Sequence, residues 1–221
     1  MKFAFAAILL LAPLKATAGE RDLASLHQFN GNVHLAPKLR LLLHSRLRFN
    51  NHVSDFLQFR AGPILFYDWR RRFQWQAGYY QLQQRSAGRM VAGQRPWAGA
   101  QVRVWGNGRW SLDWRNLIER HAFSGPGDFT RARTRAMLNL LPKAGWQPYA
   151  SAEALFLRGH AIGRYAAGLN YATAGGHLLG FGYEYRSSLD APASHIITTL
   201  IQFRLRGDRV RQKPGQAEVP Q

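Results

Sequence analysis

Residues 39–49, LRLLLHSRLRF, alternate between two kinds of side chain. The uncharged series is Leu39, Leu41, Leu43, Ser45, Leu47 and Phe49, and the residues between them, which are basic except for Leu42, are Arg40, Leu42, His44, Arg46 and Arg48. Successive side chains of a β-strand point to opposite faces, so a period of two predicts a strand between two environments. The pattern recurs along the chain and predicts an all-β, antiparallel transmembrane β-barrel with a polar, Arg-rich lumen.

The N-terminus has the organisation of a secretory signal peptide. Lys2 supplies the positive charge, Phe3 to Leu14 the apolar run and Ala16-Thr17-Ala18 the small-residue cleavage site. A membrane-anchor helix is the alternative, but the apolar run is shorter than the ~20 residues that such a helix needs. We therefore expect three parts, with the barrel in the bacterial outer membrane: signal peptide 1–18, barrel 19–206 and a disordered polar tail 207–221.

The charge balance of the exported chain is strongly basic. Without Lys2 and Lys15 it holds 28 basic residues, 25 of them Arg, against 12 acidic ones. Many basic chains bind nucleic acid. The export signal and the spreading of the arginines at strand spacing argue against that partner here. The chain has no Cys, which excludes disulfides, thiolate metal sites and thiol nucleophiles.

Eleven segments carry the strand pattern. They are 22–30, 38–49, 55–67, 71–83, 95–105, 109–120, 129–141, 147–157, 162–172, 176–187 and 195–206. Bacterial single-chain barrels have even strand numbers. We therefore expect ten crossings, with 22–30 as a short strand or a lumenal segment, or twelve if one segment hides two strands.

The two faces of these segments differ in charge. The outward series is nearly uncharged, as in Leu57, Phe59 and Leu65 or in Ile197, Ile201 and Phe203. The charged residues expected inside are Arg40, Arg46, Arg48, Arg60, Arg72, Arg103, Asp113, Arg115, Glu119, Arg131, Arg133, Arg135, Glu153, Arg164, Glu184, Arg186 and Arg204. A soluble sandwich would place apolar residues inside and charge outside.

The expected turns alternate in length, as they do in outer-membrane barrels. Short turns are expected at 68–70, 106–108, 142–145 and 173–175, and longer loops at 84–94, 121–128 and 188–194. Asn107 between two glycines is a hairpin signal. Aromatic residues beside the short turns predict a girdle at the periplasmic interface: Tyr67, Trp69, Trp105, Trp110, Trp146, Tyr149 and Tyr171.

Residues 39–206 resemble the outer-membrane barrel family catalogued as domain of unknown function 2490. The motifs that carry the resemblance are Arg60-Ala61-Gly62-Pro63, Gly78-Tyr79, Arg95-Pro96-Trp97, Leu112-Asp113-Trp114-Arg115, the Arg131, Arg133 and Arg135 series, Glu153-Ala154-Leu155-Phe156, Arg164 to Leu169, and Gly182-Tyr183. Gln94 stands where the family tends to have an acid, and Asp113 where it tends to have Glu. The resemblance implies an outer-membrane barrel and carries over no catalytic residue.

The lumenal charges have two interpretations. Buried carboxylates need partners, so Asp113, Glu119, Glu153 and Glu184 are expected to hold several arginines each. Alternatively, the surplus of Arg makes the lumen electropositive and suits a narrow anion-preferring channel. We favour a non-catalytic outer-membrane protein whose partners are membrane lipid, lipopolysaccharide and the barrel-assembly machinery.

A lipid-modifying enzyme is the other alternative. Nucleophilic catalysis by Ser needs a base within hydrogen-bond reach. Ser25 with His27 and His52 with Ser54 have same-face spacing on a strand, but neither has an acid nearby on its own face. His34, His121, His160 and His177 show no metal-ligand spacing and are expected in loops or at interfaces. We predict no catalytic residue, no metal and no cofactor.

Overall fold

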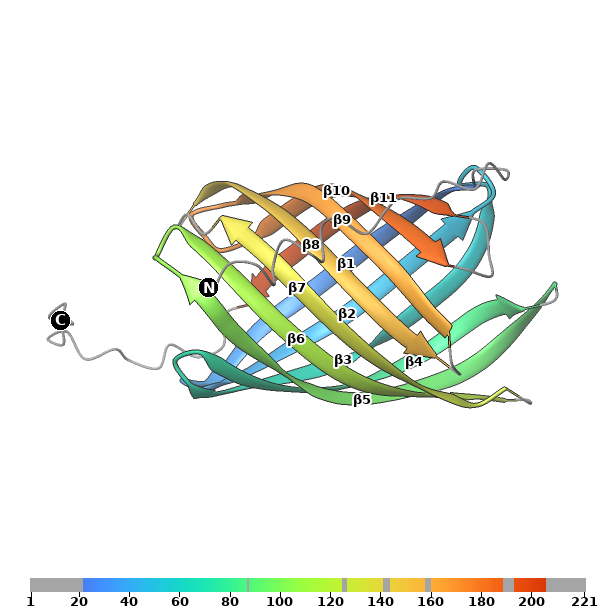
Figure 1. The fold of residues 1–221 in the computed structure, drawn as a ribbon, viewed down its shortest axis with the longest axis horizontal. Coiled ribbons are helices and arrows are strands. Elements are labelled where there is room, and N and C mark those ends of the chain that lie inside the picture. Colours follow the sequence, from blue (N-terminus) through green and yellow to red (C-terminus); the bar gives the residue numbers. More distant parts are fainter. Residues whose placement is uncertain are drawn as a thin grey trace, which may run out of the picture.

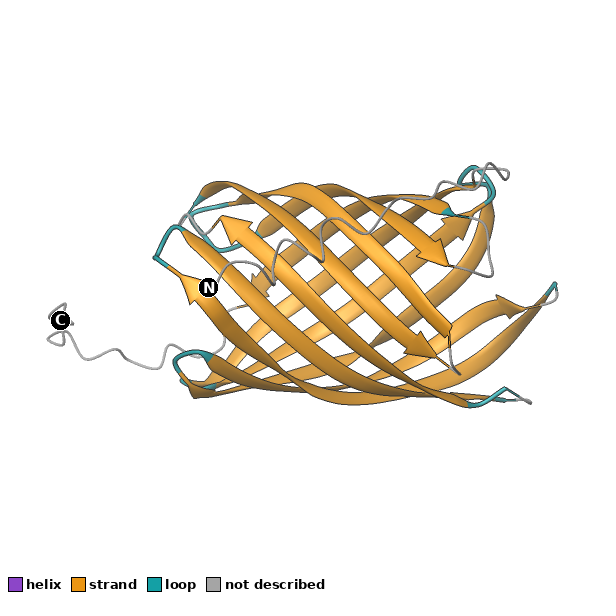
Figure 2. Cartoon of the chain, viewed as in Figure 1, coloured by secondary structure: helices purple, strands orange, loops and turns teal. Residues whose placement is uncertain are grey.

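Eleven β-strands close into a barrel in the computed structural model (Figures 1 and 2). The structure describes residues 22–86, 88–124, 127–140, 144–157, 160–188 and 193–205, so the expected signal peptide and tail lie outside it. The strands are β1 (Asp22–Ala36), β2 (Leu39–Asn50), β3 (Asp55–Arg70), β4 (Phe73–Ser86), β5 (Arg89–Gly106), β6 (Trp110–Phe123), β7 (Phe129–Leu140), β8 (Gly145–Leu157), β9 (His160–Ala172), β10 (Leu178–Ser188) and β11 (Ser194–Leu205).

The barrel closes through a parallel seam. Consecutive strands pair antiparallel, whereas β1 and β11 run parallel from Asp22 opposite Ser194 to Val33 opposite Leu205. The predicted all-β, mostly antiparallel barrel is confirmed, and the preferred count of ten crossings is wrong. An odd number of alternating strands closes only if one neighbouring pair is parallel. The first segment, 22–30, is therefore part of a full wall strand.

The two ends of the barrel do not differ in connection length. Two to five residues separate each pair of consecutive strands. The expected long loop at 84–94 was wrong, because β4 and β5 pair as far as Ser86 opposite Arg89. The Asn107 turn is present, since its Oδ1 accepts from the backbone N–H groups of Arg109 and Trp110. We call the end holding 37–38, 71–72 and 107–109 the turn end, and the opposite one the loop end.

The barrel wall separates apolar from charged side chains. Ile118 on β6 is 64% exposed, whereas the next residue, Glu119, is 1% exposed. The same contrast runs around the wall, since the alternation of each strand fixes which residues face the lumen. The lumen also holds an apolar cluster, which is made by Leu42, Ile64, Tyr80, Trp97 and Leu117 with Phe66 beside it. Among the described residues, no helix is long and apolar enough to cross a membrane.

Candidate functional site

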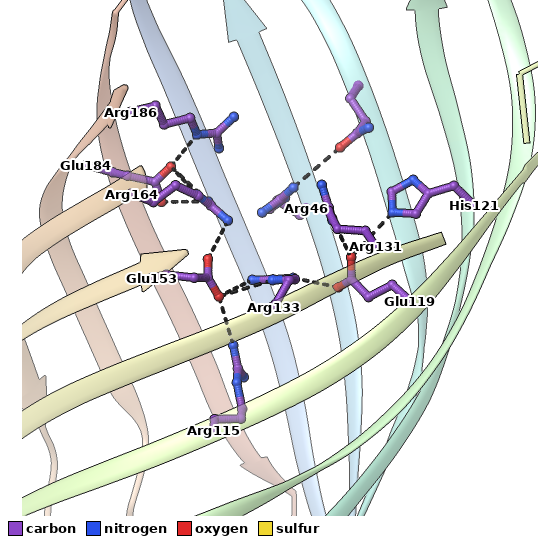
Figure 3. A network of polar contacts seen from close by, with 11 residues as sticks. Arg46, Arg115, Glu119, His121, Arg131, Arg133, Glu153, Arg164, Glu184 and Arg186 are labelled. Atoms are coloured by element: carbon purple, nitrogen blue, oxygen red, sulfur yellow. Dashed lines mark hydrogen bonds and ion pairs between the residues drawn. The ribbon is translucent and has the colours of Figure 1, made fainter. Parts of the chain in front are cut away.

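A ladder of alternating charges crosses five neighbouring strands inside the lumen (Figure 3). Arg133 on β7 donates from Nη1 to Glu119 Oε1 on β6 and from Nη2 to Glu153 Oε1 on β8, both at 2.6 Å. Arg164 on β9 reaches Glu153 Oε2 at 2.8 Å and Glu184 Oε2 on β10 at 2.7 Å. Acids stand on the even strands and arginines on the odd ones, so each acid has a cation on a neighbouring strand.

Further side chains join the ladder at both ends and at its central acid, Glu153. Glu119 also binds Arg131 and lies 3.3 Å from His121 Nε2. Glu184 accepts from Arg186 Nε at 2.6 Å, and Arg115 Nη2 lies 3.7 Å from Glu153. Charge-assisted and bidentate contacts of this kind are the strongest hydrogen bonds in proteins. Three buried carboxylates are thus each held by two or more arginines.

Arginines without acidic partners among the described residues lie on β2, β3 and β5, and we call this group, Arg46, Arg60 and Arg95, the acid-free wall. Arg60 on β3 donates from Nε to His44 Nε2 at 3.2 Å and lies over the Tyr80 ring at 4.5 Å. Arg46 on β2 donates to Gln58 Oε1 at 3.4 Å. Arg95 on β5 is 4% exposed, and its Nε has no hydrogen-bond partner within the described ranges. Among the described residues, no carboxylate lies within 4.0 Å of these three guanidinium groups.

Two cavities occupy the lumen on either side of these charges. The turn-side cavity has a volume of about 590 Å³ and the loop-side cavity about 680 Å³. Four residues line both cavities, and all are arginines: Arg46, Arg60, Arg133 and Arg164. The loop-side cavity is lined by nine arginines, namely Arg46, Arg48, Arg60, Arg89, Arg95, Arg131, Arg133, Arg164 and Arg186. None of the described residues that line it is acidic.

One protein-family model matches the larger part of the chain. The family model described as protein of unknown function DUF2490 matches residues 25–194. The chain belongs to this family. A search of curated proteins and a search of solved structures gave no match. The matched range runs from β1 to the first residue of β11, so it contains the whole charge ladder and the acid-free wall. The resemblance stated from the sequence is confirmed.

The other arginines predicted for the lumenal network have separate places. Arg103 pairs with Asp113 at 3.3 Å beside the turn-end cavity of about 530 Å³. Arg135 lines the turn-side cavity, as does Arg40, whose guanidinium lies 4.2 Å from the centre of the Phe66 ring. Arg204 is exposed at the turn end of β11, beside Gly176. Arg40 and Arg204 therefore stand apart from the ladder.

The predicted girdle residues, with one exception, lie on the outer surface at the turn end. Tyr67, Trp69, Trp105, Trp110, Trp146 and Tyr171 are exposed there, and Trp146 packs edge-on against Tyr171. Tyr149 was assigned wrongly. It lines the turn-side cavity, and its hydroxyl lies against Gly168 and Gly182. Tyr149 has the inward parity of Ser151 and Glu153, which an argument from closeness to the turn ignored.

Arg95 and His121 belong to the site but were not selected from the sequence. Arg95 has inward parity relative to Ala98 and Ala100, which were assigned to the outer face. The predicted strand 95–105 begins at Arg95, so the prediction placed this residue at the end of a strand. His121 was expected in a loop or at an interface. It lies within β6, is 2% exposed, and stacks on Phe129 at a centroid distance of 4.2 Å.

The two Ser–His pairs named from the sequence differ in the structure. Ser25 Oγ lies 3.1 Å from His27 Nε2, and His27 Nδ1 lies 2.8 Å from Thr199 Oγ1. Ser54, in contrast, donates to the Asn51 carbonyl at 2.6 Å within the β2–β3 turn. The second pair is therefore no catalytic candidate. Within the described ranges, no group of three or more His, Asp and Glu side chains is arranged to hold a metal.

Proposed function

We propose that this protein is a bacterial outer-membrane β-barrel whose lumen is closed to ion flow. The contrast in exposure between Ile118 and Glu119 carries the proposal. These neighbours show a barrel wall that is apolar on the outside and charged on the inside. In water, such a wall would expose large apolar side chains around the whole circumference. A bilayer removes that cost, and a closed barrel leaves no unpaired edge strand in it.

The aromatic residues at the turn end support one orientation in the membrane. Tyr and Trp favour the interface between lipid and water, where an apolar ring and a polar tip are both accommodated. Their outward row would place the turn end at the periplasmic interface and the loop end outside. Membrane lipid and lipopolysaccharide are then the proposed neighbours of the wall, and the barrel-assembly machinery would insert it.

The charge ladder and the acid-free wall support a closed lumen. A water-filled channel would leave these side chains exposed, but Glu119, Arg60 and Arg95 are nearly inaccessible to water. The arginines shared by both cavities stand between them. Passage of an ion would require breaking several buried, charge-assisted contacts.

Two measurements test this function. The protein should stay with the outer-membrane fraction and resist release by osmotic shock, and recovery in the shock fluid would contradict membrane placement. The purified barrel should give no current steps in planar bilayers. Discrete anion-selective steps would instead support the narrow anion channel.

Hydrolysis of a lipid ester is a second candidate function, which the Ser25–His27–Thr199 contacts favour. If His27 Nδ1–H donates to Thr199, the Nε2 lone pair can accept the Ser25 hydroxyl proton, as a nucleophile and its base require. The side chains of Ser25 and His27 belong to the outward series of β1. A hydroxyl replaces the usual carboxylate beside the base.

Turnover of phospholipid and of p-nitrophenyl esters by the purified barrel tests the second candidate. Activity should fall to background in Ser25→Ala and in His27→Ala. Ser45→Ala is the matched control, because Ser45 is also on the outer side and donates to the Phe29 carbonyl. Turnover that survives both Ser25→Ala and His27→Ala would remove this candidate.

A further inference from the structure

The lining of the loop-side cavity has many positive charges and, among the described residues, no negative ones. Nine arginines supply these charges. The carboxylates of the ladder lie on the β6, β8 and β10 wall and are shared among the arginines of β7, β9 and β10. The residues of β2, β3 and β5 that line this cavity include arginines and, among the described residues, no acid. Within the loop-side cavity, the arginines of β7, β9 and β10 are therefore paired with carboxylates, whereas Arg46, Arg60 and Arg95 are not.

Three guanidinium groups define the side that lacks neutralisation. Arg46 extends from β2 toward the ladder from across the lumen (Figure 3). Arg60, Arg95, Arg164 and Arg186 line the same cavity as Arg46. The Nε groups of Arg46 and Arg95 are buried and have no hydrogen-bond partner in the part of the chain that the structure describes. Each of these Nε–H groups therefore lacks an acceptor among the described residues.

Neutral contacts hold the acid-free wall in position. Asn30 Oδ1 lies 2.9 Å from His44 Nδ1, and His44 Nε2 accepts from Arg60. This chain fixes the neutral tautomer of His44 with its proton on Nδ1. His44 therefore orients Arg60 without cancelling its charge. A buried cation without a counter-ion is costly, so an arrangement that keeps three together favours an anion from outside the chain.

We propose that the loop-side cavity binds a phosphorylated ligand through Arg46, Arg60 and Arg95. Guanidinium groups match phosphate oxygens with paired N–H donors. The volume of about 680 Å³ lies within the range of small-molecule sites. The ligand enters from the loop end and stops at the arginines shared with the turn-side cavity. The proposal rests on the proposed function only for the source of the phosphate, which is either a soluble ester or the headgroup of an external lipid.

Calorimetric titration of the folded barrel in micelles of an uncharged detergent tests the site. Inorganic phosphate and pyrophosphate represent the soluble source, and a short-chain phosphatidic acid represents the lipid source. Binding should persist at constant ionic strength in excess chloride. Arg46→Gln, Arg60→Gln and Arg95→Gln should each weaken it about tenfold or more, since each removes a charge-assisted contact. Arg103→Gln is the matched control, because Arg103 is paired with Asp113 and does not line this cavity.

Several results would overturn the site. These are an absence of binding by all three probes, equal competition by chloride, or losses with Arg103→Gln as large as with the other variants. If a variant does not fold, the unfolding temperature of the unaltered barrel decides, because a ligand that binds only the folded state raises it. No rise with any of the probes contradicts the proposal. Conductance and fractionation test the proposed function separately, so the two can fail independently.

Discussion

Trp97 on β5 lies over Gly78 on β4, its direct partner in the ladder of backbone hydrogen bonds. A Cβ atom at residue 78 would overlap the indole ring. The ring also packs beside Tyr80, at a centroid distance of 6.0 Å, and Tyr80 lies under Arg60. Two motifs that marked the family in the sequence are therefore one packing unit, and that unit supports the acid-free wall.

Gly78→Ala should destabilise the barrel through this contact. Overpacking of a filled core costs about 1–3 kcal/mol, and the rigid indole has little room to move. Denaturant unfolding of the folded barrel measures the loss. In a Trp97→Ala background, Gly78→Ala should bring no further penalty, because the ring that the added methyl group would overlap is gone. Equal stability of Gly78→Ala and the unaltered chain would refute the packing argument.

Glu153→Gln should be the most damaging single change in the charge ladder. It removes the anion shared by Arg133, Arg164 and Arg115. Breaking a buried ion pair from one side costs about 3–5 kcal/mol, since it leaves charge uncompensated. The free energy of unfolding reports the effect.

The control for Glu153→Gln is Arg120→Gln. Arg120 and Asp128 form an exposed pair at 4.0 Å, which is worth at most about 1 kcal/mol. A loss with Glu153→Gln no larger than this control would mean that water reaches the ladder and screens it.

Side-chain alternation predicted which face each residue takes but not which residues meet. Glu153, Arg133 and Arg164 were placed inside because strand parity determines it. Their mutual contacts depend on the register between strands, which turn geometry sets and a single segment does not encode. The predicted network was accordingly too broad, since it included Arg40 and Arg204.

The errors have identifiable physical causes. Tyr149 was placed by its closeness to a turn, although its parity with Glu153 pointed inward. The strand count failed because the parity rule assumes antiparallel closure, and the parallel contact between β1 and β11 joins residues about 170 positions apart. The acid-free wall was not predicted because the missing acids become apparent only when β2, β3 and β5 are known to be on the same side.

Ile118→Arg should impair insertion into a bilayer. The side chain is on the outer wall beside the level of the ladder, where Arg costs about 2–4 kcal/mol in lipid. Folding yield into phosphatidylcholine vesicles should fall. His52→Arg is the control, because residue 52 lies in the exposed β2–β3 turn and should leave the yield unchanged. Equal yields for both variants would argue that this wall does not contact lipid.

The parallel seam can be tested by cross-linking. Asn30 on β1 lies opposite Gln202 on β11, and their side chains meet inside the lumen, with 3.4 Å between Nδ2 and Oε1. The double variant Asn30→Cys with Gln202→Cys should form a disulfide on oxidation, because directly paired residues fall within disulfide reach. The natural chain has no Cys to compete.

The matched control for the cross-link is Asn30→Cys with Thr198→Cys. Thr198 faces the same lumen but is four residues, or ~13 Å, away along β11, which is too far for a disulfide. Electrophoresis of the folded protein with and without reductant separates the outcomes. A ten-stranded barrel would join β2 directly to β11 and would leave β1 outside the wall. In that case the Asn30–Gln202 variant would not cross-link, and the odd-numbered barrel would be disproved.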